Sequence, residues 1–218
     1  MVRHAIHRLP LRHVVILLLL SLVLIPSTQA ADSRATAVAI ASQLPTTTWI
    51  GEGDGQKIVY FFFDPNCPHC NEAYAHLKPI LAVDRDIQMR YVPMGVLLPS
   101  SAGKAAAIMQ SADPLAAYHG MEEGYGFSSH GDGGAIEPIK DITPATQKAL
   151  DANYAILKNN HIPGMPLIVF KGDDGKPFML FGTRSTEFYR KLLVHVAPGE
   201  FGGGHPIPRT TDERLHRT

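Results

Sequence analysis

The chain is poor in cysteine, in tryptophan and in net charge. Among 218 residues it has two cysteines and one tryptophan, and its 20 basic side chains are balanced by 20 acidic ones. A protein that binds nucleic acid usually carries a basic surplus, so this balance argues against a nucleic-acid partner. Two cysteines cannot by themselves complete a zinc site, which takes four ligands. We therefore predict no metal, no cofactor and no nucleic-acid partner.

Long apolar runs are also scarce, and the one that stands out, Val14 to Ile25, follows a basic segment near the N-terminus. As an α-helix this run would span roughly 18 Å, which is short of the ~30 Å hydrocarbon core of a bilayer. Small residues follow in the pattern of a cleavage site after Ala30. We predict that residues 1–30 are a signal peptide that directs export to the periplasm. An uncleaved membrane anchor is the alternative.

Both cysteines lie in the stretch FFFDPNCPHCNEAY at 61–74. The segment KIVYFFF (57–63) is β-branched or aromatic on both of its faces, as expected for a central strand buried on both sides. After the second cysteine, apolar residues recur at helical spacing from Tyr74 to Leu81. Cys67 and Cys70 are therefore predicted at a junction between a strand and a helix. There they could form a structural bridge, half of a metal site or a redox centre.

The predicted position of Cys67 favours the redox centre. The N-terminus of a helix stabilises an anion, so we expect it to favour the Cys67 thiolate and to lower the pKa of that thiol. Pro68 fits the first turn of the helix, and His69 can add a donor or a positive charge. Cys70 lies one turn further and is expected to be less exposed. Cys67 is thus the predicted attacking thiol and Cys70 the resolving one.

The two rival interpretations of the pair have weaker support. A bridge that closes a loop of two residues constrains the unfolded chain little, because the entropic gain grows with loop length. A zinc site would need two more ligands, and the histidines His119, His130 and His161 are scattered without ligand spacing.

The remaining segments predict an alternation of strands and helices. A strand is expected at 87–93, a hairpin at 167–170 and 178–181, and a closing helix at 186–196. Between them lies a block of helical segments at 101–111, 113–121 and 143–160, in which Asp113 and Thr143 are helix-start residues. A C-x-x-C pair within this order predicts an α/β, thioredoxin-like fold with a helical insertion.

Taken together, YFFFDPNCPHC, GKAAAIM and GMPLIVF resemble the catalytic domain of the DsbC/DsbG family of periplasmic thiol–disulfide proteins, and its DsbG-like members in particular. The resemblance covers about Trp49 to Val196. It implies that Cys67 is the nucleophile, that Pro166 is a cis proline, and that Met165 and Pro166 bind substrate. Pro68 and His69 would tune the redox pair. The implied partners are exported cysteine-containing proteins and a membrane redox partner.

The chain departs from this family in two respects. Dimeric members carry an N-terminal dimerisation domain, whereas 27 residues run from Ala31 to Lys57 here, so we expect a monomer with weak isomerase activity. The Pro-His dipeptide between the cysteines resembles the strongly oxidising DsbA type, and Met165 stands where Thr or Val is commoner.

The sequence therefore predicts an exported thiol–disulfide oxidoreductase. A non-enzymatic binding protein on the same scaffold, with a structural disulfide, is the alternative. The expected organisation is a signal peptide (1–30), a lead-in (31–48), a catalytic domain (49–197) with a helical insert (99–160), and a tail (198–218) whose Gly, Pro and charge content predicts disorder.

Overall fold

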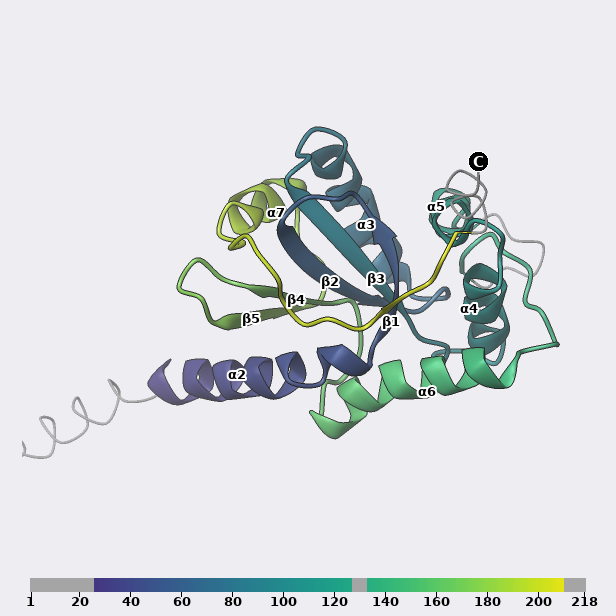
Figure 1. Cartoon of the computed structure of the whole chain (residues 1–218), viewed down its shortest axis with the longest axis horizontal. Coiled ribbons are helices and arrows are strands. Elements are labelled where there is room, and N and C mark those ends of the chain that lie inside the picture. The colour runs from purple at the N-terminus through teal and green to yellow at the C-terminus, as the bar shows by residue number, and fades with distance from the viewer. Residues whose placement is uncertain (1–25, 127–132, 210–218) are drawn as a thin grey trace, which may run out of the picture.

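The fold is built on one six-stranded sheet with helices on both of its faces (Figure 1). The structure, a computed structural model, describes residues 26–126 and 133–209. Its strands, in the sheet order β5-β4-β2-β3-β1-β6, are Pro177–Phe181, Leu167–Lys171, Lys57–Phe63, Ile87–Pro93, Thr48–Glu52 and His205–Pro206. Its α-helices are α2 (Pro26–Ala41), α3 (Pro68–Leu81), α4 (Ser101–Met109), α5 (Pro114–Glu123), α6 (Pro144–Asn159) and α7 (Thr186–Leu193), and a 3-10 helix, η1, covers Leu44–Thr46.

Strand β2 lies in the middle of the sheet, as its composition predicts. It pairs in parallel with β3 and antiparallel with β4, so that Phe61 lies between Tyr91 and Ile168. Every side chain from Ile58 to Phe63 is buried. Because both neighbouring strands and both faces are occupied, the residues that follow Phe63 start from a fixed position.

The helices form two layers over the sheet and one block at its side (Figure 1). Helices α3 and α7 contact each other on one face, while α2 contacts β5 and α6 contacts β1 and β3 on the other. In the order of the sequence, helices α4, α5 and α6 come between β3 and β4, where the helical block was expected. Asp113 and Thr143 cap α5 and α6 through their side chains, which confirms both helix-start predictions.

The prediction of a disordered tail is wrong for residues 198–209. Strand β6 pairs in parallel with β1, and the carbonyl oxygen of Gly203 accepts hydrogen bonds from Trp49 Nε1 (2.9 Å) and Tyr60 Oη (2.6 Å). The guanidinium of Arg90 donates to the same carbonyl at 3.1 Å and stacks 4.5 Å from the Trp49 ring. We call residues 201–207 the C-terminal strap. The prediction from composition was wrong here because hydrogen bonds to residues far away in the sequence, and not local apolar content, hold this segment in place.

Strand β1 and the pairing of β6 were not predicted, and part of the N-terminal prediction lies outside the described residues. The signal peptide predicted at 1–30 falls there up to residue 25, and the end of the tail falls there from residue 210. Among the residues that the structure describes, no helix is both long and apolar enough to cross a bilayer.

Candidate functional site

The two cysteines lie at the junction between β2 and α3, and their sulfur atoms form a disulfide bond. Cys67 is the N-cap residue of α3, and Pro68 occupies the first turn, where a missing N–H costs nothing. The Cys67 sulfur accepts the backbone N–H of Cys70 at 3.1 Å. This donor and the helix terminus both favour negative charge on Cys67. Cys67 is 3% exposed and Cys70 is fully buried, so the predicted order of exposure is correct.

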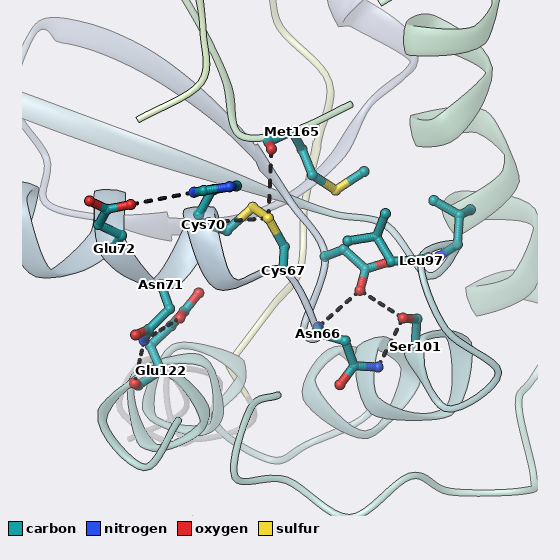
Figure 2. Close-up of a disulfide and its surroundings, with 12 residues drawn as sticks. Asn66, Cys67, Cys70, Asn71, Glu72, Leu97, Ser101, Glu122 and Met165 are labelled. Carbon is teal, nitrogen blue, oxygen red and sulfur yellow. Dashed lines mark hydrogen bonds and ion pairs between the residues drawn. A yellow bond between two sulfur atoms is a disulfide. The ribbon is translucent and has the colours of Figure 1, made fainter. Parts of the chain in front are cut away.

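The loop that enters β4 lies against the disulfide (Figure 2). The peptide bond between Met165 and Pro166 is cis, as the resemblance implied. The carbonyl oxygen of Met165 lies 3.6 Å from the Cys67 sulfur. The structure thus brings the pair Cys67 and Cys70 next to the pair Met165 and Pro166. The two pairs are separated by almost one hundred residues in the chain.

His69 is placed differently from the other predicted residues. Its side chain is 70% exposed, and its Nδ1 atom lies 3.4 Å from the Glu72 carboxylate one turn along the helix. Its described partner is therefore Glu72 and not the Cys67 sulfur. A tuning effect of His69 stays a prediction.

Asp64 is a site residue whose role the sequence did not reveal. Its buried carboxylate accepts the backbone N–H groups of Val96 (2.7 Å) and Leu97 (3.1 Å) through Oδ2. Oδ1 accepts the N–H of Asn66 at 2.9 Å and the hydroxyl of Ser101 at 2.7 Å. Asp64 therefore fastens the turn before Cys67 to the loop after β3, and its side chain is fully used in doing so.

Glu122 is a second residue that sequence reasoning missed. It lies on α5, is almost fully buried, and accepts a hydrogen bond at 2.9 Å from the side-chain amide of Asn71, the residue after Cys70. Burial raises the pKa of the Glu122 carboxyl to about 7, although the Asn71 hydrogen bond opposes this shift. In the sequence Glu122 and Glu123 look alike, and a signal for burial would have been the spacing of Tyr118, Met121 and Glu122 on one face of α5.

Comparison with known proteins identifies the family and relatives of this chain. A family model described as a thioredoxin-like domain matches residues 50–197. A curated relative, the thiol:disulfide interchange protein DsbG of Pseudomonas aeruginosa, is 27% identical over 136 residues, which cover 62% of this chain and 50% of the relative. The chain thus spans half the length of that protein, and the match confirms the resemblance to DsbG.

Solved structures show the same fold at lower identity. BcfH of Salmonella enterica Typhimurium has a TM-score of 0.62 at 15% identity, over 85% of this chain and 90% of its own. A periplasmic thioredoxin-like protein from Salmonella enterica serovar Typhimurium has a TM-score of 0.53 at 12% identity, over 73% of this chain and 94% of its own. Because a family model covers residues 50–197, which is more than half of the chain, the chain belongs to the thioredoxin-like domain family.

Proposed function

We propose that the protein is an exported thiol–disulfide oxidoreductase that exchanges disulfides with cysteine-containing client proteins through its Cys-Pro-His-Cys centre. The observation that carries the proposal is the position of Cys67, which caps α3 with its sulfur and lies beside the carbonyl of Met165. A structural disulfide does not need a hydrogen bond from a helix N–H to its sulfur. A leaving or attacking thiolate, in contrast, is stabilised by that hydrogen bond.

The exchange balances in two steps. A client thiolate attacks the Cys67 sulfur, the bond to Cys70 breaks, and Cys70 leaves as a thiolate that takes up a proton. A second client thiolate then attacks the client sulfur of the mixed disulfide, forms the client's disulfide and releases Cys67 as a thiolate. Two electrons have passed from the client to the protein.

The residues around the disulfide have separate roles in this proposal. The Cys70 N–H and the helix terminus stabilise the Cys67 thiolate once it is released. Met165 and Pro166 present backbone to the client chain, and Pro68 and His69 tune the pair. A membrane redox partner reoxidises Cys67 and Cys70. The signal-like N-terminus and the periplasmic description of one structural relative support a periplasmic location.

The reactivity of the folded protein tests the proposal. The native protein is incubated briefly with a low concentration of dithiothreitol, and free thiols are then labelled with a mass-tagged alkylating reagent. We expect rapid reduction and labelling at Cys67 while the fold is intact. A bridge that reacts only after denaturant is added would support the non-enzymatic binding protein and remove the proposed enzyme.

A further inference from the structure

His119, on the inserted helix α5, lies between two other elements of the fold. Its Nδ1 atom is 2.9 Å from Tyr74 Oη on the active-site helix α3, and its Nε2 atom is 3.5 Å from a carboxylate oxygen of Glu52 on β1. Its side chain is 26% exposed, so the ring can exchange protons with water. One imidazole thus links the helical insert to α3 and to the sheet.

The contacts of these partners show which protons the ring has to supply. The Tyr74 hydroxyl donates its only proton to the Glu123 carboxylate at 3.2 Å, so toward His119 Nδ1 it can act only as an acceptor. The Glu52 carboxylate, which also accepts a hydrogen bond from the Tyr91 hydroxyl, forms an ion pair with Nε2 only when the ring is charged. The complete set of contacts therefore requires an imidazolium with a proton on each nitrogen.

Both carboxylates keep their charge at the pH values at which an imidazole gains its second proton. Burial opposes the ionisation of Glu52, but hydrogen bonds from His119 and Tyr91 outweigh it, so that the pKa of this carboxyl lies below its ordinary value. The hydrogen bond and the charge of Lys78 lower the pKa of Glu123. Because histidine side chains in general titrate between pH 5 and pH 8, both acceptors are ionised throughout that range.

Loss of one proton breaks a contact whichever tautomer of the ring remains. If Nε2 keeps its proton, Nδ1 becomes an acceptor, and the Tyr74 hydroxyl has to turn away from Glu123 in order to donate to it. If Nδ1 keeps its proton, the lone pair of Nε2 faces the Glu52 carboxylate. The other titratable groups near the ring and its partners are Tyr118 and Glu122 on α5, Tyr91 on β3, Lys78 on α3, and Arg209, which follows β6.

We propose that His119 is a pH-sensitive clasp of the helical insert, which the imidazolium closes in mild acid and which loosens when the ring becomes neutral. Helix α3 carries Cys70, and the next residue, Asn71, contacts Glu122 of α5 at 2.9 Å (Figure 2). The contact surface that loosens is therefore the one beside the buried sulfur. The inference goes beyond the proposed function and does not depend on it, because no step of the clasp involves the disulfide.

Hydrogen exchange of the α5 backbone amides tests the clasp in the oxidised protein at pH 5 and pH 8, with rates corrected for the intrinsic effect of pH. The measurement uses the Glu122→Gln background, because the Glu122 carboxyl also titrates in this range. We expect the protection of these amides to fall roughly tenfold between the two pH values, as for the loss of one charge-assisted contact. Adding His119→Gln should make protection equal at both pH values. Equal protection before His119 is changed, or an unchanged fall afterwards, would overturn the inference.

A matched control and a direct measurement of the ring keep the test specific. His195→Gln removes another histidine that pairs with a carboxylate, that of Asp173 at 2.8 Å, and should leave the tenfold fall as it is. Nitrogen NMR of the isotope-labelled ring should show a proton on both nitrogens of His119 at pH 5 and on one nitrogen at pH 8. A neutral His119 ring at pH 5, or a fall that disappears in the His195 variant, would contradict the clasp. Each of these outcomes leaves the proposed function standing, since the dithiothreitol experiment decides it separately.

Discussion

At the scale of single residues, Glu122 is the most unusual group in the site. A carboxyl whose pKa is raised to about 7 binds a proton more tightly in the folded chain than in the unfolded one. The contribution of Glu122 to the free energy of unfolding is fully present at pH values below its ordinary pKa of 4.5. It is lost as the pH rises to about 7. Neutralising this residue should therefore stabilise the fold increasingly as the pH rises from 4.5, and most strongly above pH 7.

We predict that Glu122→Gln gains stability relative to the wild type between pH 5 and pH 8, by up to ~3 kcal/mol. The glutamine can still accept the hydrogen bond from Asn71 but carries no charge to bury. Denaturant unfolding of both oxidised proteins at the two pH values measures the difference. Glu123→Gln is the matched control, because Glu123 is exposed and Lys78 lowers the pKa of its carboxyl. Parallel pH profiles for the wild type and both variants would rule out a buried, titrating Glu122.

The two cysteines have different proposed roles, and this difference predicts different behaviour of their serine variants. Cys70→Ser leaves the attacking thiol without its resolving partner, so this variant should accumulate mixed disulfides with client proteins. Cys67→Ser leaves a thiol at a fully buried position and should accumulate none. Non-reducing electrophoresis of the two variants, recovered from cells after acid quenching of thiols, measures the adducts. Equal trapping by both variants would contradict the assigned roles.

The residue types at the site were predictable where a local motif carries them. Cys67, Pro68 and Cys70 were placed correctly because a buried strand followed by a helical pattern fixes the junction. Asp64 and Glu122 were not foreseen, because their partners lie on other elements and no local pattern names them.

At the scale of elements, helix α5 is fastened to the active-site helix α3 along one line. Asn71, Tyr74 and Lys78 of α3 face α5, at the helical spacing of neighbouring turns. Asn71 meets Glu122, Tyr74 Oη lies 2.9 Å from His119 Nδ1, and Lys78 forms an ion pair with Glu123 at 2.7 Å. The inserted block is therefore attached to the helix that carries Cys70.

The C-terminal strap offers a second test at this scale. Tyr60 Oη donates to the Gly203 carbonyl and accepts from Arg90 Nη1 (2.6 Å) and from the Gly203 N–H (2.8 Å). We predict that Tyr60→Phe loses about 2 kcal/mol of folding free energy, because a buried guanidinium and a carbonyl lose their shared partner. It should also speed chymotryptic cleavage after Phe201. Denaturant unfolding and timed proteolysis measure the two effects.

Tyr154→Phe is the matched control for the strap, since Tyr154 is a half-exposed residue on α6. Its removal of a hydroxyl should change neither stability nor cleavage by a measurable amount. If Tyr60→Phe behaves like this control, the strap is not held by the Tyr60 hydroxyl.

Helices and strands were predictable where the sequence pattern that marks them lies within the element itself. Strands β2, β3, β4 and β5 and helices α3 to α7 follow apolar periodicity and helix-start residues, and all were expected near their observed places. Strand β6 covers two residues, which is too short for a periodic pattern, and β1 (TWIGE) lacks the continuous apolar run that marks β4 and β5. Their pairing joins positions more than 150 residues apart, such as Thr48 and His205, and no window of sequence contains both.

At the scale of the whole molecule, the oligomeric state stays a prediction. We expect residues 31–218 to sediment as a monomer and to rescue a scrambled multi-disulfide substrate only weakly, because a single active site cannot hold a client between two facing sites. Sedimentation velocity and refolding of such a substrate, each run with the Cys67→Ser variant as a blank, measure the two properties. A stable dimer with strong isomerase activity would contradict both expectations.

The position of the strap also bears on how the protein is made. Gly203 is synthesised more than 140 residues after Tyr60, and its carbonyl completes the environment of Arg90 at the centre of the sheet. Until residues 201–207 emerge from the ribosome, Arg90 lacks the carbonyl oxygens of Phe201 and Gly203, and the edge of β1 lacks β6. The nascent chain thus remains less stable until this segment has been synthesised. If the protein is exported as proposed, such a delay would favour passage through the membrane before folding.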